Sequence, residues 1–223
     1  MRSLTRPTRA AVIAAPLVAA IVAATLLAPT TQRHGDGHWT EGSTHKGWTT
    51  VFSGYGTVSE GQSRITLDPR ATSHPTVTHG ALVVSDERFA DLRAQATITT
   101  LAQHRAETPN PWEVGWFVWH YTGRSAFYAV VLKPTGWEIS KQDPAYPGAQ
   151  RFLASGTNPT FPVGTAHTVV VTQRGATFTV AAGGRTLATV TDTERPYLGG
   201  AVGLYTEDAK VMFTNVITAG DSI

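Results

Sequence analysis

The chain has 223 residues, of which 41% are hydrophobic and 15% charged, with 21 glycines, 13 prolines and no cysteine. This composition is typical of a globular protein and excludes a disordered, collagen-like or disulfide-stapled chain. The formal net charge is +2, but Arg2, Arg6 and Arg9 all precede a long apolar run. The rest of the chain carries 15 basic and 16 acidic residues, and this near-neutral balance argues against nucleic-acid binding.

The N-terminus combines these three arginines with an uncharged run at residues 10–28. This order predicts a secretory signal peptide at residues 1–28. The run is also just long enough to cross a bilayer, so an uncleaved membrane anchor is the alternative. Its alanines, threonine and Pro16 make it only weakly hydrophobic, which favours cleavage. We therefore expect a secreted, extracellular domain that contacts a membrane only if the leader stays attached.

Residues 29–47 are rich in His, Gly and Thr. Because such a composition buries too little apolar surface to offset ordering entropy, it predicts a flexible linker. The alternative is a copper or nickel site built from the histidines, which would need ligands held at fixed spacing. The sequence shows nothing that would hold them.

From Trp48 onward, short alternating runs are separated by Gly and Pro, and no stretch repeats apolar residues at helical spacing. This pattern predicts an all-β domain at residues 48–220, built as two packed antiparallel sheets. Hairpin turns are indicated at 122–125, 134–136 and Gly183-Gly184. The expected strands are residues 49–52, 55–59, 64–67, 76–79, 81–84, 90–99, 112–121, 127–133, 136–141, 151–154, 168–172, 177–182, 185–191, 202–205 and 209–218.

The expected strand at 112–121 carries aromatic residues at both odd and even positions. Successive side chains of a strand point to opposite faces, so either both faces are buried or one is an exposed aromatic platform. Aromatic platforms bind sugars, because the C–H faces of a pyranose pack on a ring while nearby polar groups bond its hydroxyls. The alternative is a core that is rich in tryptophan.

Four segments resemble the framework of the concanavalin A-like jelly-roll superfamily: His79-Gly-Ala-Leu-Val-Val-Ser, Arg88-Phe-Ala-Asp-Leu-Arg-Ala-Gln-Ala, Gly199-Gly-Ala-Val-Gly-Leu-Tyr and Lys210-Val-Met-Phe-Thr-Asn-Val. Within it, the chain is most similar to secreted domains of the 3-keto-disaccharide hydrolase or laminarinase-like type. The resemblance covers residues 48–218 and implies a jelly-roll sandwich whose concave sheet forms a glycan groove. The paired-carboxylate string E-x-D-x-x-E of laminarinases is absent, and Glu138-Ile-Ser-Lys-Gln-Asp143 has a different spacing. The strands typical of alginate lyases are absent as well.

Glu138 is the leading candidate for an acid or base, with Lys133 across the predicted hairpin. The alternative is that these two form an exposed cross-strand ion pair. A glycosidase needs a second carboxylate at about 5 to 9.5 Å, and Glu113 and Asp143 are the nearby suppliers. If the long link at 142–156 folds over the concave sheet, it adds to the groove. The expected carbohydrate-binding residues are Trp116, Trp119, Tyr121, Lys133, Trp137, Lys141, Gln142, Tyr146 and Arg151.

Glu207 and Asp208 are the candidates for a calcium site, although two acids fall short of the usual six to eight oxygen ligands of that ion. We expect a polar turn there and no cofactor. The sequence has no P-loop, G-x-G-x-x-G, H-E-x-x-H or G-x-S-x-G motif, which disfavours nucleotide chemistry, zinc proteolysis and serine hydrolysis.

Three hypotheses follow. The first is a module that binds an extracellular polysaccharide or oligosaccharide on the concave face. The second is a glycoside hydrolase or polysaccharide lyase in the same groove. The third is a structural envelope domain without a ligand.

Overall fold

The computed structural model describes residues 38–61, 63–74, 76–105 and 107–223. The predicted leader at 1–28 and most of the predicted linker lie outside the described residues. Within the described part, no helix is long and apolar enough to cross a membrane.

The described residues form β-strands with one short 3₁₀ turn, which confirms the all-β prediction. The strands are β1 (Thr44–His45), β2 (Trp48–Phe52), β3 (Thr57–Gly61), β4 (Arg64–Asp68), β5 (Gly80–Gln103), β6 (Gly115–Gly123), β7 (Ala126–Lys133), β8 (Gly136–Gln142), β9 (Gln150–Gly156), β10 (His167–Arg174), β11 (Thr177–Ala182), β12 (Arg185–Thr191), β13 (Gly200–Glu207) and β14 (Ala209–Ser222), with η1 at Pro147–Ala149.

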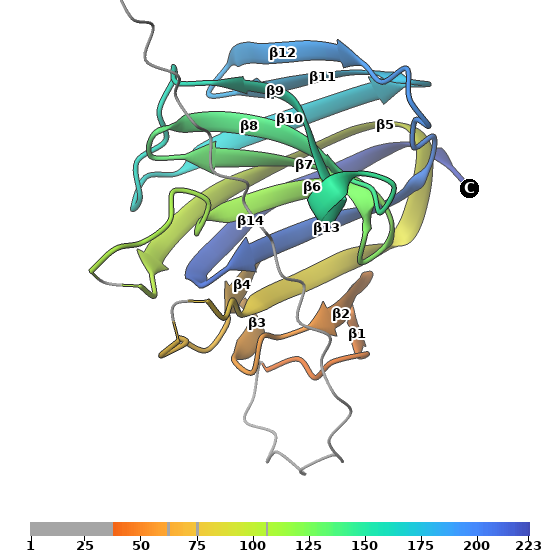
Figure 1. Cartoon of the computed structure of the whole chain (residues 1–223). Helices are drawn as coiled ribbons and strands as arrows, with labels where there is room; N and C mark the ends of the chain where they lie inside the picture. The colour runs from red at the N-terminus through yellow and green to blue at the C-terminus, as the bar shows by residue number, and fades with distance from the viewer. Residues whose placement is uncertain (1–37, 62, 75, 106) are drawn as a thin grey trace, which may run out of the picture.

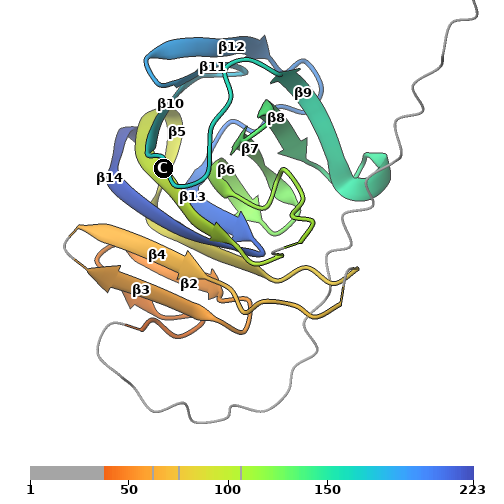
Figure 2. The same cartoon turned by 90° about the vertical axis from the view of Figure 1, so that its left-hand side faces the viewer.

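The strands form two antiparallel sheets that share strand β5, as Figures 1 and 2 show. The first sheet has the order β1-β2-β5-β13-β6-β7-β8-β9, and the second has the order β12-β11-β10-β5-β14-β4-β3. The early part of β5 pairs with the first sheet, where Leu82 lies opposite Tyr205. Its later part pairs with the second sheet, where Ile98 lies opposite Phe213. Strand β5 therefore passes from one layer of the sandwich to the other.

The main core lies between the two sheets, and alternate residues of each strand point into it. Trp119 of β6 packs there against Phe178 of β11, with ring centroids 5.3 Å apart. On the strands of the first sheet, the residues that alternate with these core residues point to the opposite face of that sheet. They form a second, smaller cluster that includes Trp116, Val118 and Val131. Strand β6 is therefore covered on both faces.

The predicted hairpin turns form where expected. Gly183 and Gly184 both have positive φ, 56° and 78°, which a type I′ turn requires and glycine adopts without a steric cost. Pro134 and Thr135 connect β7 to β8, since Lys133 pairs with Gly136.

Three expectations differ from the structure. The expected strand at 76–79 does not form, and the segments at 81–84 and 90–99 belong to the single strand β5. The exposed charges at residues 86–88 lie within β5, where it leaves the first sheet. The domain also begins before Trp48, because Trp39 is buried in the main core and β1 lies within the predicted linker. Residues 38–47 are thus part of the sandwich.

Candidate functional site

A shallow groove of about 700 Å³ lies on the outer side of the first sheet, at the β7–β8 hairpin and strand β9. Its position follows from the register of three strands. Glu138 of β8 lies opposite Val131 of β7 and Ser155 of β9, so these three share the outer face. The lining residues are Lys133, Thr135, Trp137, Glu138, Phe152, Ser155, Gly156 and Thr157.

The indole of Trp137 forms an edge of the groove rather than a platform. Trp137 belongs to the main core, and its Nε1 donates to the carbonyl oxygen of Asn158 at 3.1 Å. Gly156 packs so closely on this ring that a Cβ there would lie 2.8 Å from it. Glycine at 156 therefore lets β9 approach the indole and fixes that wall of the groove.

The groove combines an exposed ring with charged and hydroxyl groups. Phe152 is 53% exposed. Lys133 and Glu138 form an ion pair across the hairpin, with both side chains mostly buried. Thr135, Ser155 and Thr157 add hydroxyl groups. Such a surface offers apolar contact together with hydrogen-bond donors and acceptors, which suits a ligand with both a C–H face and hydroxyls.

The two further carboxylates predicted from the sequence lie outside this groove. Glu113 accepts hydrogen bonds or ion-pair contacts at 2.7 Å from Asn110 and Arg105. Burial raises the pKa of Glu113. Asp143 pairs with Arg195 at 3.0 Å. Among the described residues that line the groove, Glu138 is the sole carboxylate, so the structure gives no support to a pair of catalytic carboxylates.

The expected aromatic platform on β6 and β8 is wrong, because its tryptophans are buried. Trp119 is fully enclosed between the sheets, and its Nε1 donates to Gln173 Oε1 at 2.8 Å. Trp116 is buried on the opposite face as a member of the second cluster, and half-buried Tyr121 packs against that cluster. Trp137 is buried as described above. Both faces of β6 are covered, so the alternative of a core that is rich in tryptophan is the correct one.

Lys141, expected to bind a ligand, is instead fully buried in an ion pair between the two sheets. Its Nζ donates to Asp192 Oδ2 at 2.7 Å and to the carbonyl oxygens of Glu194 and Arg195. The ammonium also lies 4.6 Å from the ring centroid of Tyr197. Burial raises the pKa of Asp192, but the hydrogen bonds from Lys141 and from the Tyr128 hydroxyl outweigh it and hold this pKa below its ordinary value.

The remaining predicted residues, Gln142, Tyr146 and Arg151, form hydrogen bonds that connect the β8–β9 link with the segment after β12. The carbonyl oxygen of Gln142 accepts a hydrogen bond from the Tyr197 hydroxyl at 2.7 Å. Tyr146 donates to the Glu194 carboxylate, and Arg151 donates to the Tyr146 hydroxyl at 3.0 Å. These contacts hold the long link against the neighbouring sheet, away from the residues that line the groove.

Glu207 and Asp208 form the polar turn before β14. Asp208 accepts hydrogen bonds from the His79 backbone N–H at 3.0 Å and from Arg105 at 2.7 Å. Glu207 accepts one from the Tyr205 hydroxyl, and burial raises the pKa of Glu207 to about 7. The described residues contain no group of three or more His, Asp or Glu side chains that could hold a metal ion.

Phe152, which carries the exposed surface of the groove, was not singled out from the sequence. The signal was present in the adjacent apolar residues Phe152 and Leu153. Since neighbours in a strand face opposite ways, one of the two had to point outward. Leu153 packs against the main core, and Phe152 points out.

Comparison with known proteins identifies the fold. No protein-family model matches the sequence, and no curated protein matches it significantly. Among solved structures, a carbohydrate-binding module, CBM66 from Bacillus subtilis, is similar with a TM-score of 0.61 at 17% identity, over 78% of this chain and 96% of that one. The VIP36 exoplasmic/lumenal domain, in a Ca²⁺/Man3GlcNAc-bound form, is similar with a TM-score of 0.50 at 12% identity, over 77% of this chain and 83% of that one.

A third similar structure is a sialidase, with a TM-score of 0.52 at 10% identity, over 78% of this chain and 17% of that one. The chain thus has a jelly-roll β-sandwich fold, which is the fold that the resemblance of its framework segments implied. At these identities the likeness concerns the fold.

Proposed function

We propose that the protein binds an extracellular polysaccharide or oligosaccharide through the groove at the β7–β8 hairpin. The observation that carries this proposal is the exposed Phe152 ring beside the Lys133–Glu138 ion pair and three hydroxyl side chains. A pyranose ring would lie on Phe152, and the charged pair and hydroxyls would bond its hydroxyl groups. The fold shared with a carbohydrate-binding module supports the same ligand class.

The open shape of the groove favours binding along a glycan chain. The groove runs between the β7–β8 turn and β9, and its volume lies within the range of about 300 to 1,000 Å³ that is common for ligand sites. The predicted leader would place the domain outside the cell, where polysaccharides are exposed, either secreted or anchored to the membrane.

The test is a binding screen of soluble polysaccharides and oligosaccharides by affinity electrophoresis and calorimetry, comparing Phe152→Ala with Ile217→Ala. Ile217 lies on the second sheet and is exposed to the same 53%, so it controls for loss of an exposed apolar side chain. We expect Phe152→Ala to weaken binding about tenfold, because a stacked aromatic residue is a typical binding hot spot. Ile217→Ala should bind like the unmodified protein.

Equal binding by the two variants would refute the role of the groove. Absence of binding to any glycan would favour the ligand-free structural domain. Release of new reducing ends or unsaturated ends, abolished in Glu138→Gln, would instead favour the hydrolase or lyase hypothesis.

A further inference from the structure

A second pocket, of about 190 Å³, lies at the edge of the sandwich where strands of both sheets meet. The β1–β2 hairpin of the first sheet and the β3–β4 hairpin and β14 of the second contribute to it. Figure 2 shows β3 and β4 side by side at this edge, with β2 at the same end of the molecule. The lining residues are Trp39, Lys46, Trp48, Glu60, Ser63, Arg64, Ile65, Phe213 and Val216. None of them lines the groove described above.

The apolar part of this pocket is built around two indole rings. Trp39 is buried, and its ring stacks on His45 with centroids 4.7 Å apart and planes 10° from parallel. This stacking fixes the orientation of the Trp39 indole. Trp48 is half-buried, so part of its ring remains accessible. Ile65 and Phe213 come from the inner face of the second sheet and complete the apolar lining.

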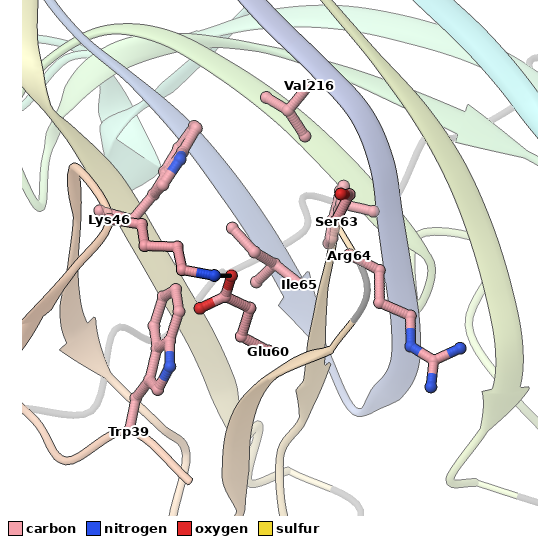
Figure 3. Close-up of a pocket in the computed structure, with 9 residues that line it drawn as sticks. Trp39, Lys46, Glu60, Ser63, Arg64, Ile65 and Val216 are labelled. Atoms are coloured by element: carbon pink, nitrogen blue, oxygen red, sulfur yellow. Dashed lines mark hydrogen bonds and ion pairs between the residues drawn. The ribbon is translucent and has the colours of Figure 1, made fainter. Parts of the chain in front are cut away.

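The polar part is an ion pair between the two hairpins. Lys46 Nζ donates to Glu60 Oε1 at 2.7 Å, and Figure 3 shows both side chains pointing toward one another beside Ile65 and Trp39, with Arg64 pointing away. The Lys46 side chain is 80% exposed and that of Glu60 21%. Because an exposed ion pair adds little to stability, its ammonium and carboxylate are available to hydroxyl groups of a ligand.

The turn that presents Lys46 is unusual for this residue type. Lys46 and Gly47 connect β1 to β2, and their φ angles are 47° and 84°. Both positions of such a turn favour Asn, Asp or Gly, since other side chains are strained at positive φ. The chain therefore places a lysine beside the pocket at a position where a smaller residue would fit the turn better.

The size of the pocket limits the ligand to one ring. Cavities of about 150 Å³ hold a single benzene ring, whereas drug-sized ligands occupy about 300 Å³ or more. We propose that this pocket binds one uncharged sugar ring, with Trp48 against its C–H face and Lys46 and Glu60 bonded to its hydroxyls. Lys46 and Glu60 neutralise each other in their ion pair, so the pair offers partners for hydroxyl groups without a net charge that would attract an acidic sugar. The choice of ligand class rests on the proposed function, whereas the site itself is separate from the groove.

The test uses the full chain with nitrogen-15-labelled tryptophan and follows the indole N–H signals by NMR during titration with glucose, galactose, mannose, fructose and glucuronate. We expect at least one of the neutral sugars to shift the Trp39 and Trp48 signals in a saturable manner. Trp48→Ala and Glu60→Gln should each weaken this sugar's affinity about tenfold or more. Trp112→Ala removes a half-buried tryptophan outside both sites and should have no effect.

Glu60→Gln keeps the proposal testable if Trp48→Ala does not fold. No saturable shift with any neutral sugar, or unchanged affinity in folded Glu60→Gln and Trp48→Ala, would overturn the proposal. Glucuronate binding as tightly as the neutral sugar would refute the uncharged ligand. These outcomes are independent of the groove, since Phe152→Ala should leave monosaccharide binding at this pocket unchanged and affect only polysaccharide binding.

Discussion

Strand β8 contributes one member to each of two lysine–carboxylate pairs, and the two pairs lie on its opposite faces. Lys141 and Asp192 are both completely buried between the sheets, whereas Lys133 and Glu138 line an open groove on the outer face. Burial of a charge is costly unless it is paired, so the inner pair binds the two layers together. The outer pair can exchange its partner for water or a ligand. The comparison shows that the two faces of one strand hold such a pair in different surroundings, one sealed between the sheets and the other bordering a groove.

We expect the largest loss of stability from Trp119→Ala, on the inner face of the first sheet. Removal of this indole leaves a cavity between the sheets, and Gln173 Oε1 loses its hydrogen-bond donor. We expect a loss of about 3–5 kcal/mol in the free energy of unfolding, measured by urea denaturation. If the variant kept its stability and lost glycan binding instead, Trp119 would be a ligand contact and the comparison between the faces would fail.

Lys141→Met should destabilise the protein almost as strongly. The substitution removes the cation that lies 2.7 Å from the buried Asp192 carboxylate and leaves only the longer contact with Arg151 at 4.0 Å, at a cost of about 3–5 kcal/mol. The double variant Lys141→Met, Asp192→Leu removes both charges and should recover much of this loss. The interaction energy from the double-mutant cycle is the measurement, and additive effects would contradict a coupled pair.

The same pair should make stability dependent on acid pH. The pKa of folded Asp192 lies below its ordinary value of 3.8, so its contribution is complete above that value and is lost as the pH falls through the folded pKa. Unfolding free energies measured between about pH 2 and 6 should therefore fall more steeply for the unmodified protein than for Asp192→Asn. Parallel curves would show that Asp192 is not held ionised by Lys141.

Lys133→Met, on the outer face, should have the smallest effect on stability. Its pair with Glu138 is partly buried but borders the open groove, so water can reach the carboxylate that the substitution leaves unpaired, and we expect a smaller loss of stability in urea denaturation than for Lys141→Met. Glycan affinity should fall in the same variant. A loss of stability as large as that of Lys141→Met would erase the distinction between the two pairs.

Sequence periodicity predicted which side chains share a face, but not which face is covered. Period-two alternation places Glu138 and Ser140 on one face of β8 and Trp137, Ile139 and Lys141 on the other, and the structure has this division. Alternation with a period of two shows which residues share a face but not whether that face is buried. The aromatic residues of β6 were therefore compatible with an exposed platform and with a core. Both faces of β6 are covered by residues that are distant from it in the sequence, such as Phe178 of β11.

Contacts of long sequence separation could not be predicted for the same reason. Lys141 meets Asp192 across 51 positions, and no local pattern marks the pair. Trp39 was placed in a linker because isolated apolar residues among Gly, Thr and His give no periodic signal. The hairpins, by contrast, were predictable from Gly and Pro, whose backbone preferences act locally.

The passage of β5 through both layers also has a consequence for the order in which the chain folds. β5 ends at Gln103, yet its neighbours β13 and β14 begin only at Gly200 and Ala209. Such distant pairings delay folding, since the intervening chain must be ordered before they form. During synthesis on the ribosome, neither layer can close until these late strands emerge. A nascent polypeptide of this design therefore keeps the inner faces of both layers open for most of its translation.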